Sequence, residues 1–127
     1  DVILANRTRS RADQLWSDFG AKIKVVDWMK VQNYLSDAST VINATSLGME
    51  GKAELPIPLQ GLKKNTLVTD IVYTPLNTPL LENAAKRGCR TVDGLGMLIH
   101  QAIPGFERWF GVKPDVSENL RELLISR

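Results

Sequence analysis

Short runs of apolar residues alternate along this chain with stretches in which apolar side chains recur every third or fourth position. The first pattern predicts strands and the second predicts helices. We expect strands at residues 2–5, 22–26, 40–43, 67–72 and 90–92, and helices at 9–19, 27–35, 79–87, 95–110 and 116–125. Such alternation is typical of βαβ units, so the sequence predicts an α/β fold with a parallel sheet flanked by helices.

The pattern also predicts which parts are buried. The strands at 2–5 and 67–72 are apolar on both sides, so we expect both faces to be covered. Apolar stripes at helical spacing predict the buried side of the first and longest helices: Ala12, Leu15, Trp16, Phe19, Met97, Leu98, Ile103, Phe106 and Trp109. Pro104 should kink or split the longest helix. Gly51, Pro56 and Pro58 indicate an ordered loop from Glu50 to Leu59.

Composition narrows the class of protein. The 127 residues suffice for one compact domain, and 43% hydrophobic with 24% charged residues is ordinary for a globular chain. The net charge of +2 demands neither nucleic acid nor membrane, and no apolar run is long enough to span a bilayer. Cys89 is the one cysteine and His100 the one histidine, so we expect no disulfide and no zinc site, in a reducing, cytoplasmic setting.

An arginine-rich segment follows the first strand. It consists of Asn6, Arg7, Thr8, Arg9, Ser10 and Arg11. Thr8 is a natural helix N-cap, which puts Arg9 and Arg11 in the first helical turn. A cation costs about 0.3–1 kcal/mol there, so a bound anion is the simplest reason for the cluster.

Three interpretations of this cluster stay open at this point. They are a solvated basic loop, a nucleic-acid patch, and a site for the 2′-phosphate of NADP. A strand followed by a helix favours NADP, because an arginine at the second strand of a dinucleotide-binding fold accommodates that phosphate. Trp16 and Phe19 fall on the apolar helical stripe instead of beside the arginines, which argues against nucleic acid.

Four short segments combine into a more specific pattern. They are Asn6-Arg7-Thr8 with Arg11, Asn43-Ala44-Thr45-Ser46 with Gly48-Met49, Asp70 to Tyr73 with Pro75, and Asp93-Gly94 with Met97 and Gln101. In this order and spacing they resemble the NADP-binding domain of the shikimate dehydrogenase family, over nearly the whole chain. The resemblance implies a Rossmann-like fold and an enzyme that reduces 3-dehydroshikimate to shikimate by hydride transfer from NADPH.

The resemblance also implies roles for residues. Residues 6–11 would hold the adenosine 2′-phosphate, and residues 43–46 would shape the cofactor cleft. Ile71 and Gly94 would approach the nicotinamide end through their backbones, and Tyr73 and Gln101 would contact the substrate. Without the resemblance, Tyr73 could be bonded to backbone and Gln101 a plain exposed helix residue. We expect Asp70 and Asp93 to accept bonds from nearby backbone N–H groups.

The resemblance places the family's catalytic lysine and aspartate in a preceding substrate domain, so we expect no catalytic residue here and no activity from this chain alone. The chain opens at Asp1 directly into a strand, and we expect residue 1 to be a cut point. The family's first Rossmann strand would lie between residues 2–5 and 40–43, and its absence would leave two exposed edges. That is unfavourable for an isolated monomer, and a homodimer is left open.

We therefore expect residues 1–112 to form a partial NADP-binding domain, and the helix in residues 113–127 to pack on the substrate domain. Two alternatives remain. One is a paralogue with quinate/shikimate dehydrogenase activity using NAD, or with another hydroxy acid as substrate. The other is a non-enzymatic module that binds nucleotide or nucleic acid.

Overall fold

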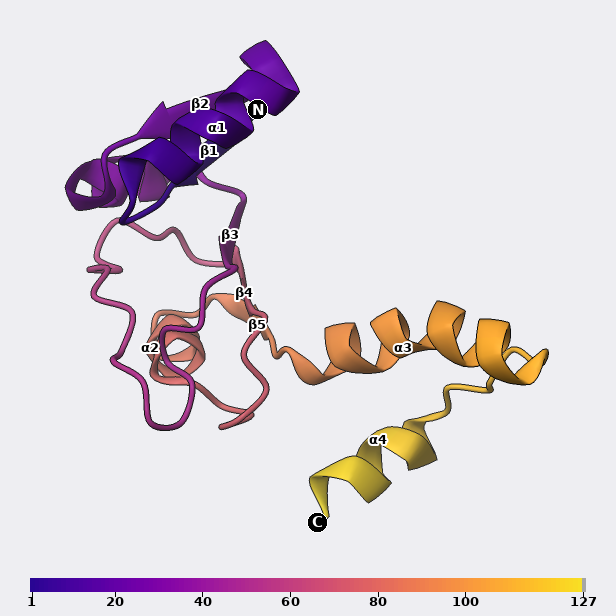
Figure 1. The fold of residues 1–127 in the computed structure, drawn as a ribbon. Coiled ribbons are helices and arrows are strands. Elements are labelled where there is room, and N and C mark those ends of the chain that lie inside the picture. The colour runs from indigo at the N-terminus through magenta and orange to yellow at the C-terminus, as the bar shows by residue number, and fades with distance from the viewer. Residues whose placement is uncertain (127) are drawn as a thin grey trace.

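The computed structural model describes residues 1–126, apart from the side chain of Glu118. Figure 1 shows the chain path. The elements in order are β1 (Val2–Ala5), α1 (Arg9–Phe19), η1 (Gly20–Lys22), β2 (Ile23–Val26), η2 (Trp28–Asp37), β3 (Thr40–Asn43), β4 (Leu67–Asp70), α2 (Pro79–Lys86), β5 (Arg90–Val92), α3 (Leu95–Phe110) and α4 (Glu118–Ile125). The predicted α/β class is confirmed, and η2 is a run of 3-10 turns where an ordinary helix was expected.

Within residues 1–126 the strands form two parallel sheets, ordered β1-β2 and β3-β4-β5. Asn43 at the end of β3 lies opposite Asp70 at the end of β4. The expected strand at 67–72 ends early because the Asp70 carboxylate accepts the N–H of Val72 at 3.0 Å, which turns the backbone out of the sheet. The carboxyl ends of β3 and β4 therefore finish side by side.

The free edges of β1 and β3 pair with no strand in the described part of the chain. This matches the predicted strand order, in which a central strand separates them. The expectation that β1 is covered on both faces is wrong, because Val2 and Ile3 are 54% and 41% exposed. β1 is paired only with β2, so its side chains lack neighbours on the other edge.

The core lies where α2 packs on β4 and β5. Its buried members are Leu35, Leu59, Val68, Leu80, Leu81 and Ala84. Leu55 and Ile57 from the loop before β4 pack against this cluster, so the expected ordered loop is confirmed and closes one side of the core. Thr78 caps α2 by accepting the N–H of Leu81, and Pro79 takes the first helical position, where its missing N–H is not needed.

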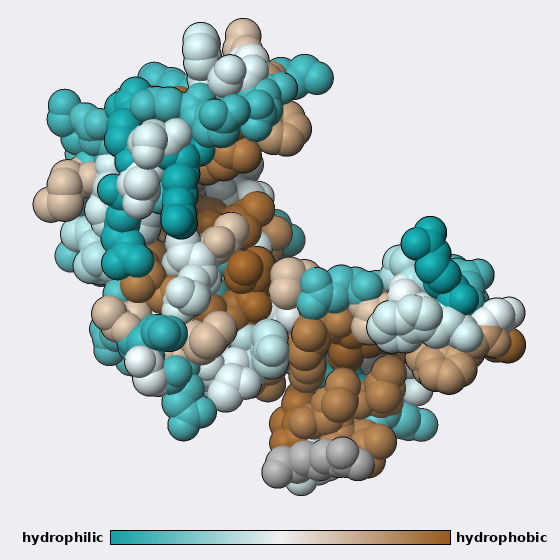
Figure 2. Space-filling view, in the orientation of Figure 1, coloured by the Kyte–Doolittle hydropathy of each residue, from teal (hydrophilic) through white to brown (hydrophobic). Residues whose placement is uncertain are grey.

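Helix α3 leaves the sheets and projects outward, with α4 returning beneath it (Figure 1). Pro104 does not split α3, which runs unbroken from Leu95 to Phe110. Several side chains expected to be buried are exposed: Leu15, Trp16, Phe19, Met97, Phe106 and Trp109. Figure 2 shows apolar surface gathered over the region of α3 and α4. No element in residues 1–126 covers these stripes, whereas Leu95 and Ile99 at the start of α3 are buried against the domain.

No helix in the described residues is both long and apolar enough to cross a membrane.

Candidate cofactor-binding site

Three segments that follow the carboxyl ends of β1, β2 and β3 meet at one pocket of about 240 Å³. Its walls are Asn6, Arg7, Thr8, Arg11, Trp28, Ala44, Thr45 and Ser46. The arginine-rich segment and the segment at 43–46 lie far apart in the sequence, and the parallel strands bring them together. Ligands bind at the carboxyl ends of strands in open parallel sheets, so the pocket lies where this architecture places a site.

A tight turn presents Arg7 to the pocket. The Asn6 side chain accepts the N–H of Thr8 at 2.8 Å, closing the turn with Arg7 at its tip. Thr8 occupies the N-cap position of α1, as predicted. In the described structure, however, the Thr8 side chain accepts no helix N–H, so its hydroxyl lines the pocket without a capping role.

The three arginines have different surroundings. Arg9 pairs with Asp13 at 2.7 Å and with Asp27 at 3.1 Å. The hydrogen bond to Asp13, followed by the charges of both carboxylates, raises the pKa of Arg9. Among residues 1–126, Arg7 and Arg11 pair with no carboxylate, and both line the pocket. Two uncompensated guanidinium groups at one pocket suit an anion with several oxygen atoms, such as a phosphate.

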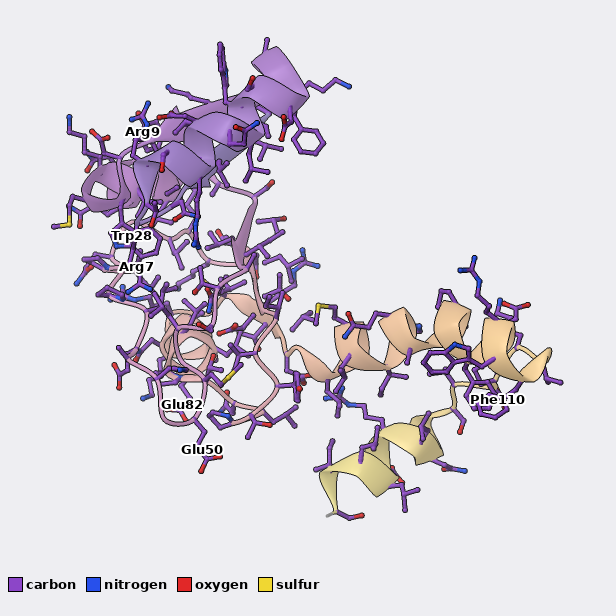
Figure 3. The ribbon with its side chains drawn as sticks, viewed as in Figure 1. Arg7, Arg9, Trp28, Glu50, Glu82 and Phe110 are labelled. Atoms are coloured by element: carbon purple, nitrogen blue, oxygen red, sulfur yellow. The ribbon has the colours of Figure 1, made fainter. Side chains whose placement is uncertain are left out.

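Arg9 and Ser10 do not line this pocket. Arg9 and Arg11 are two residues apart on α1, so the 100° rotation per residue puts them on different sides of the helix, and Arg9 faces the two carboxylates that pair with it. Figure 3 shows Arg9 on the outer side of the layer and Arg7 close to Trp28.

Asn43 shapes the loop at 43–46 from inside. Its amide donates to Leu47 O and to Asp70 Oδ1, both at 2.9 Å. Its Oδ1 accepts the N–H of Thr45 at 3.1 Å and the Thr45 hydroxyl at 2.7 Å. The side chain is buried and used on both its donor and acceptor sides, so Asn43 orients Ala44, Thr45 and Ser46 toward the pocket and is not itself part of the pocket wall.

Asp70 joins this loop to the rest of the fold. The carboxylate is 1% exposed, and it accepts bonds from the Asn43 amide, the Val72 N–H and, at 2.8 Å, the Thr78 hydroxyl. The predicted bond from Asp70 to backbone N–H is confirmed, and the two side-chain bonds add to it. The three bonds fix the end of β3, the end of β4 and the start of α2 in one arrangement.

The backbones of Ile71 and Gly94 are in direct contact at the ends of β4 and β5. A Cβ added at Gly94 would lie 2.6 Å from Val72 O and closer still to Ile71 O, which no side chain allows. Asp93 accepts the N–H of Leu95 at 3.0 Å, as predicted, and also binds both terminal nitrogens of Arg121, at 3.2 and 2.5 Å. The Gly94 turn therefore brings the start of α3 against the segment after β4.

Tyr73 and Gln101 are both exposed, Tyr73 just beyond the Ile71–Gly94 contact and Gln101 on α3. Neither lines the pocket that contains Arg7. His100 is exposed on α3, and the half-buried Cys89 thiol lies 3.6 Å from Lys63 O. The predicted residues thus fall into two groups, one around the arginine pocket and one along the Ile71–Gly94 contact and α3.

Comparison with known proteins shows what this chain resembles. Residues 94–123 match the family described as the shikimate 5′-dehydrogenase C-terminal domain. A shikimate dehydrogenase (NADP(+)) of Cereibacter sphaeroides is 58% identical over 126 residues, which is 99% of this chain and 45% of the relative. The chain is similar to shikimate dehydrogenases over nearly its whole length. It spans about half the length of the curated relatives it matches.

Two solved structures resemble this fold. A quinate dehydrogenase from Corynebacterium glutamicum, in complex with NAD, is 34% identical with a TM-score of 0.85, covering 98% of this chain and 46% of that one. A shikimate 5-dehydrogenase from Thermus thermophilus, in complex with NADP(H) and shikimate, is 33% identical with a TM-score of 0.75, covering 90% and 41%. The Rossmann-like character of the predicted fold is therefore confirmed.

Two features of the site and its supporting residues were missed by sequence reasoning. Trp28 was treated only as part of a short helix, although it follows Asp27 at the end of β2, where a ligand-facing residue is expected in a parallel sheet. Thr78 carries a recognisable capping signal before Pro79, but its bond to Asp70 depends on the tertiary fold.

Proposed function

We propose that this chain provides the NADP-binding part of a shikimate dehydrogenase, which transfers hydride reversibly between NADPH and 3-dehydroshikimate to give shikimate. The observation that supports this most is the pocket with Arg7 and Arg11 uncompensated and Thr8, Thr45 and Ser46 beside them. Guanidinium groups bind the oxygens of a phosphate through charge-assisted bonds, and hydroxyls add further donors. NADP differs from NAD by one such phosphate.

The remaining predicted residues fit the rest of that cofactor. Because Gly94 has no side chain, its turn packs directly against the backbones of Ile71 and Val72, and this is where the nicotinamide end is proposed to lie. When bound, the nicotinamide cofactor supplies or accepts the hydride. Tyr73 and Gln101 are proposed to orient the substrate by hydrogen bonds from their exposed polar ends.

We further propose that residues 1–112 form the cofactor domain and that the α4 helix packs on a substrate domain. Leu123, Leu124 and Ile125 expose an apolar face that no element in the described residues covers, and Arg121 anchors α4 to Asp93 beside the Gly94 turn. Arg127, the last residue of the segment expected to pack there, lies outside the described residues. A reducing, cytoplasmic setting suits the unpaired thiol of Cys89.

A second candidate is quinate dehydrogenase with NAD, favoured by the likeness to the quinate dehydrogenase structure in complex with NAD. Measuring kcat/KM of the full-length protein for shikimate and quinate, each with NADP⁺ and with NAD⁺, separates the two. The proposal expects shikimate with NADP⁺ to give the highest value. A preference for quinate with NAD⁺ would replace it with the second candidate, and no turnover with any pair would reject both.

A further inference from the structure

Trp28 is the one aromatic residue that lines the arginine pocket in the described structure. It begins η2 immediately after β2 and is half-buried, while the next residue, Met29, is 82% exposed. Trp28 is not a member of the buried apolar cluster between α2 and the sheet. Its indole is therefore partly covered by a polar pocket wall that includes Arg7 and Arg11, and not by the core.

The backbone that carries Trp28 is held in place. The preceding residue, Asp27, accepts a bond from Arg9 at 3.1 Å, which ties the start of η2 to the first turn of α1. The Lys30 N–H donates to Asp27 O at 2.9 Å, and the Lys30 ammonium lies 3.7 Å from the Asp27 carboxylate. Because Arg9 ties Asp27 to the first turn of α1, the backbone that carries Trp28 is held beside the arginine-rich segment, and Figure 3 shows Trp28 next to Arg7.

We propose that the Trp28 indole is a stacking surface for the adenine ring of the cofactor, next to the 2′-phosphate held by Arg7 and Arg11. This inference rests on the proposed function and adds a recognition element to it. A pocket of about 240 Å³ has room for more than a phosphate group. The only part of the cofactor attached to the same ribose as the 2′-phosphate, apart from the pyrophosphate, is adenine. Aromatic side chains stack on bases without needing hydrogen bonds to particular atoms.

A stacking residue should affect cofactor affinities in a different way from a residue that binds the 2′-phosphate. Adenine is common to NADP⁺ and NAD⁺, so a stacking residue contributes equally to the binding of both. Arg7 and Arg11, by contrast, should contribute mainly to NADP⁺. The affinity ratio for the two cofactors therefore separates Trp28 from the arginines in the same pocket.

The test compares Trp28→Leu and Trp28→Phe in the full-length protein by calorimetric titration with NADP⁺, NAD⁺ and adenosine 2′-monophosphate. Trp28→Leu should weaken binding of all three by a similar factor of about 5- to 150-fold, the range equivalent to base stacking on an aromatic ring. Trp28→Phe should recover most of the loss, because a smaller aromatic ring still stacks. Trp16→Leu is the matched control, since Trp16 is exposed on α1 and outside the pocket, and it should bind like the wild type.

Unchanged affinities in Trp28→Leu would overturn the inference, and so would a loss confined to NADP⁺. If Trp28→Leu does not fold, the test is fluorescence of a full-length variant in which Trp16, Trp109 and any tryptophan outside residues 1–127 are replaced by phenylalanine. Trp28 fluorescence in that variant should be quenched by adenosine 2′-monophosphate, and no quenching would overturn the inference. If Arg7→Ala loses NADP⁺ preference while Trp28→Leu binds normally, only this inference fails. If the wild type binds neither cofactor, the proposed function fails.

Discussion

Replacing Asp70 with alanine should destabilise the protein severely. The carboxylate is 1% exposed and accepts bonds from the Asn43 amide, the Val72 N–H and the Thr78 hydroxyl. Alanine would leave those three donors without their acceptor in the interior. Each stranded buried group costs about 1–3 kcal/mol.

Two effects make the loss of stability smaller than the sum of these three costs. Water can enter the vacated space, and removal of the buried charge relieves its own desolvation. Because the three partners share one site, their costs are also not additive. We therefore expect a loss of about 3–5 kcal/mol, a large part of the roughly 5–15 kcal/mol that stabilises a domain.

The assay is urea unfolding of the full-length protein, followed by circular dichroism. Asp70→Asn keeps the shape and one acceptor oxygen, so it should lose less, about 1–2 kcal/mol. Asp18→Ala makes the same change on the exposed side of α1, where Asp18 accepts only from Gln14, and should stay within about 0.5 kcal/mol of wild type. If Asp70→Ala is no less stable than Asp18→Ala, the buried network does not hold the site together.

Further predictions concern the second half of the site. Gly94→Ala should abolish tight cofactor binding, because its Cβ would lie 2.6 Å from a backbone oxygen. Calorimetric titration with NADP⁺ measures this affinity, and a normal affinity would contradict the close contact. Tyr73→Phe and Gln101→Ala should each raise KM for shikimate by a factor equivalent to about 1–3 kcal/mol, with NADP⁺ affinity unchanged. A loss of NADP⁺ affinity with an unchanged KM for shikimate would show that the residue does not contact the substrate. Arg121→Ala should lower the free energy of unfolding by about 1 kcal/mol at low salt and by less at high salt, because its partner Asp93 is partly exposed. Thermal unfolding at two ionic strengths checks this.

Sequence periodicity located the elements well because helices and strands impose different spacings on buried side chains. It could not say what covers an apolar stripe. Trp16 and Phe19 have helical spacing with Ala12, yet only Ala12 is buried in the described structure. Periodicity reports which face of a helix is apolar, whereas burial depends on a neighbour that a local pattern does not contain.

The site could also be predicted only in part from the sequence. Strand ends marked the segments at 6–11 and 43–46, because parallel strands deliver their carboxyl ends to one edge. Which residues of these segments line the pocket, and which do not, could be seen only in the folded structure. Asn43 was expected at the cofactor, but its amide donates a hydrogen bond to Asp70, which lies 27 residues away in the chain. Helical rotation already predicts that Arg9 points away from its neighbours, but only the structure shows Asp27 beside it.

Recognition of a 2′-phosphate by Arg7 and Arg11 can be tested directly through the ratio of NADP⁺ to NAD⁺ affinity in the full-length protein. Each charge-assisted bond to a phosphate contributes about 1.5–3 kcal/mol, so Arg7→Ala should reduce that ratio by about 10- to 100-fold. NAD⁺ affinity should change by no more than about twofold. Arg9→Ala is the matched control, because Arg9 is paired with Asp13 and Asp27, and should keep the wild-type ratio. Equal losses for NADP⁺ and NAD⁺ in Arg7→Ala would show that the arginine cluster is structural and would contradict the account.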